Sequence, residues 1–196
     1  MDFQTLKSNV ESALGRSDVP DYVYSFMMAD INRDLRILEM QASTTLSATS
    51  ETVTLPNDFM AVESLYVDAT PRLAMQPITD QSMAIRHDSS GKPYYYSVIN
   101  SSLNLMPAPD GTYSLKLRYY TKLADFSGAT DTNDVITAHP SLFMYSALRH
   151  AAVWKQDIEL AGSYDKVYSA TLDGILKADR KNRNSGPMVS RPGVKV

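Results

Sequence analysis

Apolar positions in the first forty residues recur with the period of an α-helix. The first stripe comprises Phe3, Leu6, Val10 and Leu14. Gly15 follows where a left-handed helix cap belongs, and Asp18 is a suitable N-cap with Pro20 just inside the next helix. Neither Gly nor Pro interrupts residues 21–41, and apolar positions keep the helical spacing there. The pattern therefore predicts a helical hairpin whose second helix extends to Gln41.

The pattern changes to β-structure in the middle of the chain. Alternating segments bounded by turn residues predict strands at 51–55, 61–67, 72–78, 94–99, 103–106 and 113–120. In the last segment Leu115 and Leu117 alternate with Lys116 and Arg118, which is typical of an antiparallel sheet with one buried face.

Helical spacing returns after residue 136. Pro140 suits a first helical position, and Asp157 suits the cap of a last helix that continues to about residue 180. The helix between them is apolar on two sides, so it has to be covered from most directions. The residues on these two sides include Leu142, Phe143, Tyr145, Ala147 and Trp154.

The order helix, helix, β segment, helix, helix predicts an α+β fold. The N- and C-terminal helix pairs, residues 1–48 and 137–180, are expected to form a four-helix bundle. Residues 49–136 form an inserted antiparallel β domain. Residues 181–196 contain four basic and no acidic side chains, two Pro and two Gly, which predicts a flexible, extended C-terminal arm.

Composition narrows the class of protein. The chain has 196 residues, 43% of them hydrophobic, a net charge of −3 and no cysteine, which fits a folded protein without disulfides. Its apolar runs are far shorter than the ~20 residues of a membrane span, and its first residues do not resemble a signal peptide. We therefore expect no membrane contact.

Residues for catalysis are few. His139 and His150 would lie about 16 Å apart on a helix, too far to share a metal, and His87 is isolated. No phosphate-binding glycine loop and no GxSxG motif occurs. We expect no enzyme and no catalytic, cofactor-binding or metal-binding residues. The rival hypothesis is a hydrolase of unrecognised type that depends on His139 or His150.

Aromatic and basic residues on the predicted strands raise the question of nucleic-acid binding. Tyr94–Tyr96 and Tyr119–Tyr120 occur with Lys116 and Arg118, a combination that can stack single-stranded bases. Without the four basic residues of 181–196, however, the rest of the chain carries a net charge of −7, which repels phosphate. We expect DNA to pass without specific binding. A second rival hypothesis is a binding module that recognises a carbohydrate or peptide through Tyr94–Tyr96.

Five segments, in order, resemble the head-to-tail adaptors of tailed bacteriophages, the group that includes tail tubular protein A. They are Ile31–Arg36; Leu55–Phe59 followed by Leu65–Asp68; Leu103–Pro109 followed by Leu115–Tyr120; Pro140–Tyr145 with Ala151 and Ala152; and Ala178–Arg183. Together these segments span residues 31–183, which is most of the chain.

The resemblance implies a structural protein of the virion neck that assembles in the host cytoplasm. Such adaptors form a homo-oligomeric ring, usually of twelve subunits, between the portal protein and a downstream tail or nozzle protein, and they continue the channel for double-stranded DNA. No catalysis and no cofactor is implied. In such a ring, the helix that is apolar on two sides would pack against a neighbouring subunit, with Phe143, Ala147, Trp154, Leu142 and Tyr145 as the candidates. We expect the arm to contact the portal through Arg183, Met188, Val189, Arg191 and Pro192. A different neck component, such as a tail-completion protein, is the closest alternative.

Overall fold

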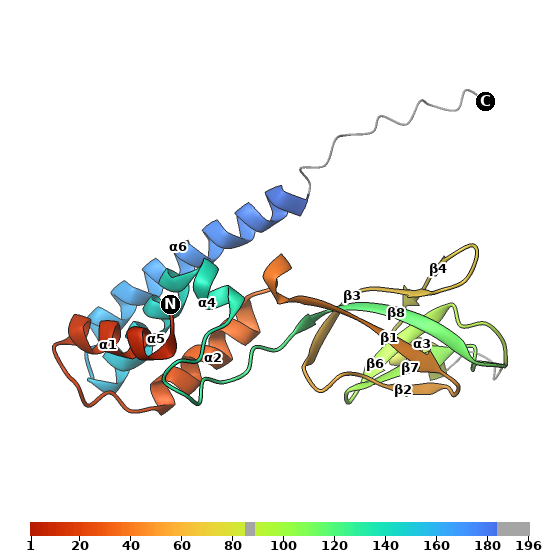
Figure 1. Ribbon diagram of the computed structural model, residues 1–196, viewed down its shortest axis with the longest axis horizontal. Coiled ribbons are helices and arrows are strands. Elements are labelled where there is room, and N and C mark those ends of the chain that lie inside the picture. Colours follow the sequence, from red (N-terminus) through yellow and green to blue (C-terminus); the bar gives the residue numbers. More distant parts are fainter. Residues whose placement is uncertain (85–88, 184–196) are drawn as a thin grey trace, which may run out of the picture. The chain divides into compact units, whose positions relative to one another are not determined.

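The computed structural model describes residues 1–84 and 89–183 and is α+β (Figure 1). Contacts within the chain divide it into two compact units. The helical unit combines Met1–Glu39 with Ala124–Val196, and the β unit is the continuous segment Met40–Leu123.

Helix α5 is the centre of the helical unit. The helices of this unit are α1 (Phe3–Leu14), α2 (Tyr22–Asp34), α4 (Asp134–Ala138), α5 (Pro140–Trp154) and α6 (Ile158–Arg183). α5 packs against α1, α2, α4 and α6, as its broadly apolar circumference requires. The specific four-helix bundle predicted from the sequence is not confirmed, because the helices are arranged around one central member.

Local sequence explains where several helices begin and end. The Asp2 carboxylate accepts a hydrogen bond from the Thr5 amide at 2.8 Å, and Gly15 closes α1 with φ 64°. Asp157 accepts from the Leu160 amide at 3.0 Å at the start of α6. Pro140 occupies the first turn of α5. The predictions for Gly15, Pro140 and Asp157 are confirmed.

The second helix is shorter than predicted at both ends. It begins at Tyr22, and Asp18 instead forms an ion pair with Arg16. It ends at Asp34, because Leu35 adopts an extended conformation with φ −100° and ψ 132°. After a short 3₁₀ turn, η1 (Leu38–Met40), the chain enters a strand at Gln41, and its Ser- and Thr-rich sequence pairs with a later strand. The prediction of helix to Gln41 was wrong because Ile37 and Met40 are buried without continuing the helix.

The β unit consists of two four-stranded sheets and the short helix α3 (Asp80–Ala84). The first sheet has the order β1 (Gln41–Ala48), β8 (Tyr113–Thr121), β3 (Phe59–Val67), β4 (Leu73–Ala74). The second has the order β2 (Thr52–Thr54), β7 (Ser102–Met106), β6 (Tyr95–Ile99), β5 (Gln76–Pro77). All the strand pairs are antiparallel except β5 with β6, which is parallel. β1 is the strand that the sequence analysis missed.

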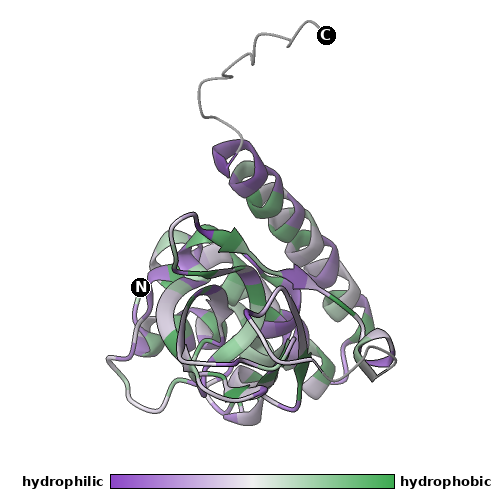
Figure 2. Ribbon diagram, turned by 90° about the vertical axis from the view of Figure 1, so that its right-hand side faces the viewer, coloured by the Kyte–Doolittle hydropathy of each residue, from purple (hydrophilic) through white to green (hydrophobic). Residues whose placement is uncertain are grey.

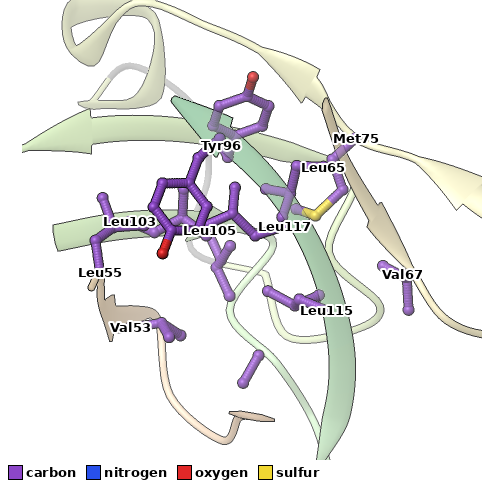
Figure 3. Packing of buried hydrophobic residues seen from close by; sticks show 12 residues of the cluster. Val53, Leu55, Leu65, Val67, Met75, Tyr96, Leu103, Leu105, Leu115 and Leu117 are labelled. Carbon is purple, nitrogen blue, oxygen red and sulfur yellow. The ribbon is translucent and has the colours of Figure 1, made fainter. Parts of the chain in front are cut away.

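Leucines from both sheets form the core of the β unit (Figure 3). Leu115 and Leu117 of β8 point inward and contact the same cluster as Leu103 and Leu105 of β7. Lys116 and Arg118 point to the opposite face of β8, as the alternation predicted. The core therefore fixes which face of the first sheet carries its charges.

The C-terminal helix extends beyond the other helices of its unit and shows mixed hydrophilic and hydrophobic positions along its length (Figures 1 and 2). It continues to Arg183, so residues 181–183 of the predicted arm are helical. Residues 184–196 lie outside the described part of the chain. None of the described helices combines the length and apolar character needed to cross a bilayer.

We predict that Leu103→Ala lowers the free energy of unfolding by about 2–5 kcal/mol, because Leu103 is fully buried between the sheets. Urea denaturation followed by circular dichroism measures the change. Val98→Ala on the adjacent strand is the control, since Val98 is exposed and its truncation should cost less than about 1 kcal/mol. Equal losses in the two variants would contradict the assignment of this core.

Candidate protein–protein interface

A network of charged side chains joins three helices of the helical unit. Asp30 of α2 accepts hydrogen bonds from both Arg149 and His150 of α5. Arg149 also donates to Asp165 of α6 at 2.7 Å, and its guanidinium lies 3.9 Å from the ring centroid of Tyr168. One arginine thereby fixes α2 and α6 on the same side of α5.

A second contact reinforces the junction of α2 with α6. The Tyr168 hydroxyl donates to the Asp34 carboxylate at 3.1 Å, and Tyr168 is buried. Arg33 pairs with Asp30 and Asp34 from the solvent side, at 2.8 and 2.7 Å. Each carboxylate of α2 in this region is therefore hydrogen-bonded or ion-paired.

The network changes the protonation of its members. Burial acts to raise the pKa of Asp30, but the hydrogen bonds and positive charges of His150 and Arg149 outweigh it, so this pKa is lowered. Burial raises the pKa of Tyr168, and the nearby Asp34 carboxylate raises it further. At neutral pH Asp30 is therefore ionised and Tyr168 is neutral.

The pairing of His150 with Asp30 resembles part of a hydrolase triad in composition only. A triad also needs a nucleophilic hydroxyl hydrogen-bonded to the same imidazole. In the described residues, His150 is hydrogen-bonded to Asp30 and its ring contacts Phe26, and no hydroxyl is bonded to it. The described groups of three or more His, Asp or Glu include none arranged to hold a metal ion.

Four large apolar side chains are exposed around this network, and we call them the apolar patch. Their exposed fractions are 47% for Tyr22, 52% for Phe26, 54% for Val153 and 70% for Ile158. His150 connects the members of the patch. The Tyr22 ring lies 5.5 Å from the Phe26 ring, the Phe26 ring lies 5.7 Å from the His150 ring, and His150 lines an open hollow with Val153 and Ile158. Clustered exposed apolar residues at a hollow are typical of a protein–protein interface.

The residues predicted for subunit contact differ in exposure. Leu142, Phe143 and Ala147 are fully buried in the helical unit, so their apolar surface is covered within the chain. Tyr145 and Trp154 remain partly exposed. Tyr145 lies against Tyr164 of α6, and the Arg16 guanidinium lies 4.8 Å from the Trp154 ring centroid.

The arm residues are described in part. The Arg183 side chain donates to Asp179 at 2.7 Å, and Asp179 also accepts from the Leu38 amide at 2.9 Å. Arg183 is thus held at the end of α6. Met188, Val189, Arg191 and Pro192 lie outside the described residues, as does His87.

The aromatic surface considered for nucleic-acid or glycan binding is divided by the fold. Tyr96 and Tyr119 are buried in the core of the β unit, while Tyr94 is exposed. Tyr119 also donates to Asp58 at 3.1 Å. The hydroxyl of Tyr119 and the ring of Tyr96 therefore make contacts within the β unit. The consecutive residues Tyr94, Tyr95 and Tyr96 do not share one face.

Sequence reasoning missed Asp30 and the apolar patch. Phe26 and Ile158 belong to helical stripes that periodicity assigns to the interior, and periodicity does not reveal which end of a stripe stays uncovered. Asp30 is interleaved with Arg33, Asp34 and Arg36 in the sequence, a pattern that is typical of a solvated helix face. The adjacent polar residues Arg149 and His150 on the otherwise largely apolar α5 were the available signal for a polar contact at Asp30.

The class of protein follows from a comparison with protein families. The model of the SU10 adaptor protein family matches residues 1–191. The chain belongs to this family, which confirms the resemblance to phage head-to-tail adaptors. Family membership indicates a bacteriophage structural protein of the virion neck that interacts with other head or tail proteins. No curated protein matches the chain.

We predict that Asp30→Asn lowers the free energy of unfolding by about 2–4 kcal/mol at pH 5, because Arg149 loses its buried counter-charge. The pKa of Asp30 is lower in the folded than in the unfolded chain, where it is near 3.8. The carboxylate's stabilisation is therefore complete above about pH 4 and is lost as the pH falls through the folded pKa. Urea denaturation of the wild-type protein and of Asp30→Asn should show that the difference in their free energies of unfolding decreases as the pH falls from about 5 to about 2.5.

Asp165→Asn is the matched control, because Asp165 pairs with the same arginine but is exposed. This substitution should lower the free energy of unfolding by at most about 1 kcal/mol. If Asp30→Asn lowers the free energy of unfolding by the same amount at every pH, a role for the charge of the Asp30 carboxylate is contradicted.

Proposed function

We propose that this protein is a ring-forming adaptor that joins the portal of a phage head to its tail. Copies of the chain surround the axis and contact one another through their helical units. The ring continues the channel for double-stranded DNA. The observation that carries the proposal is the family match over residues 1–191. The expected number of subunits is twelve.

The apolar patch supports an assembly of several chains. An exposed surface that contains Tyr22, Phe26, Val153 and Ile158 is costly in water and is stabilised when another protein covers it. Beneath the patch, the Arg149 contacts to Asp30 and Asp165 hold α2, α5 and α6 in fixed relation. A rigid apolar surface of this kind loses little conformational entropy on association.

The C-terminal segment supports contact with the portal. Residues 184–196 contain two basic and no acidic side chains and follow directly on α6. We assign Met188, Val189, Arg191 and Pro192 to docking on the portal, with Arg191 pairing with a portal carboxylate. Arg183 acts as the last fixed point of the helix, through Asp179.

The net charge is compatible with a DNA channel. Without its basic C-terminal residues the chain is acidic, and an acidic wall repels phosphate rather than retaining it. In this proposal DNA passes the ring without specific binding, and the downstream contact is a tail or nozzle protein.

We predict that a chain ending at Arg183 loses at least tenfold in affinity for the portal, because the docking residues are removed. Co-sedimentation with portal-bearing capsids measures the bound fraction. The matched control replaces residues 184–196 with a Gly/Ser segment of equal length, which should lose affinity equally. Unchanged attachment of both variants would refute the docking role of this segment.

A further inference from the structure

The surface opposite the apolar patch carries a second open hollow. It lies between α1 and α5, and its lining includes Asn9, Ser12 and Ala13 of α1 with Ser141 and Met144 of α5. We call these five residues the uncharged face. Every exposed residue of α1 between Gln4 and Ala13 is uncharged, although a solvated helix face normally carries charges.

Helix geometry places the two surfaces on opposite sides of α5. Met144 belongs to the uncharged face and Val153 to the apolar patch. They are nine residues apart, which is about two and a half turns at 3.6 residues per turn. The two side chains therefore leave α5 in opposite directions.

Two different surfaces on opposite sides of a subunit are what a head-to-tail contact requires. A two-fold contact uses one self-complementary surface on both copies. A head-to-tail contact instead joins two unlike surfaces, and it closes into a ring when the rotation between successive copies allows closure. Charged residues are depleted at the centre of protein–protein interfaces. On one surface, Phe26, Val153 and Ile158 are exposed apolar side chains, and the charged residues that line the same hollow are ion-paired with one another. On the other surface, Asn9, Ser12 and Met144 are uncharged.

We propose that the apolar patch of one copy docks on the uncharged face of the next copy, with Val153 and Ile158 entering the hollow between α1 and α5. This inference rests on the proposed ring, and it specifies which surfaces form the contact between subunits. Arg33 and Asp165 lie at the rim, where their charges stay in water. In this arrangement α5 is covered by its own chain on two sides. Its exposed sides at Val153 and at Met144 are each covered by a neighbouring copy.

The absence of cysteine from the chain permits a direct test. Val153→Cys and Met144→Cys are each the sole thiol of their chain, and neither alters a charge. Adaptor assembled on portal rings from a mixture of the two variants, treated with a short bismaleimide, should give a cross-linked dimer. Each variant assembled alone should give none, because the like thiols lie on different interfaces.

Several results would overturn the proposal. Cross-linking of Val153→Cys with itself would show a two-fold contact. No product from the mixture, in complexes shown by mass to contain several copies, would show that other surfaces meet; the proposed ring would stand in that case. Complexes with a single copy would instead refute the ring. Val98→Cys, an exposed valine of β6, is the control and should give no product with either variant.

A charge at the centre of the patch gives an independent test. Val153→Glu should reduce the number of copies retained on the portal at least tenfold, because an unpaired carboxylate would be buried at the contact. Val98→Glu should leave that number unchanged. Circular dichroism should be unchanged in both, since both valines are exposed. Full retention of Val153→Glu would contradict the docking of this patch.

Discussion

The helical unit depends on the burial of α5. This helix is apolar around most of its circumference, so it is stable only when other helices cover it, and α1, α2, α4 and α6 do so. Leu142, Phe143, Ala147 and Ala151 lose all of their exposed surface in this arrangement. Since both halves of the unit in the sequence contribute covering helices, the unit requires residues from before and after the β unit.

Polar contacts then determine how the covering helices are oriented. Apolar packing is not directional, whereas the bonds from Arg149 to Asp30 and Asp165 require particular positions of α2 and α6. The buried carboxylate of Asp30 is stable because it has several hydrogen-bonding partners. The apolar patch lies directly beside these contacts, so its shape is set by the same charges.

Much of the architecture could be predicted from the sequence, for physical reasons that differ between elements. α1 and β8 were predictable because their apolar periods are regular and their ends carry turn residues such as Gly15 and Gly111. β1 was not, because its Ser- and Thr-rich sequence has no regular alternation of apolar residues. Before it, the helical spacing continues through Leu35 to Leu38, although the backbone is already extended at Leu35. The long-range pair of Asp30 with Arg149 was also out of reach, since 119 positions separate the two residues and no local pattern links them. The function was inferred from the family resemblance, whereas the exposed surfaces could be identified only from the structure.

We propose that several copies of this chain assemble with one another on a portal ring. Native mass spectrometry of the purified adaptor–portal complex tests it most directly. We expect a single species whose mass corresponds to one closed ring of adaptor chains bound to the portal ring. A complex that holds one adaptor chain, or a broad series of occupancies without a closed ring, would contradict it.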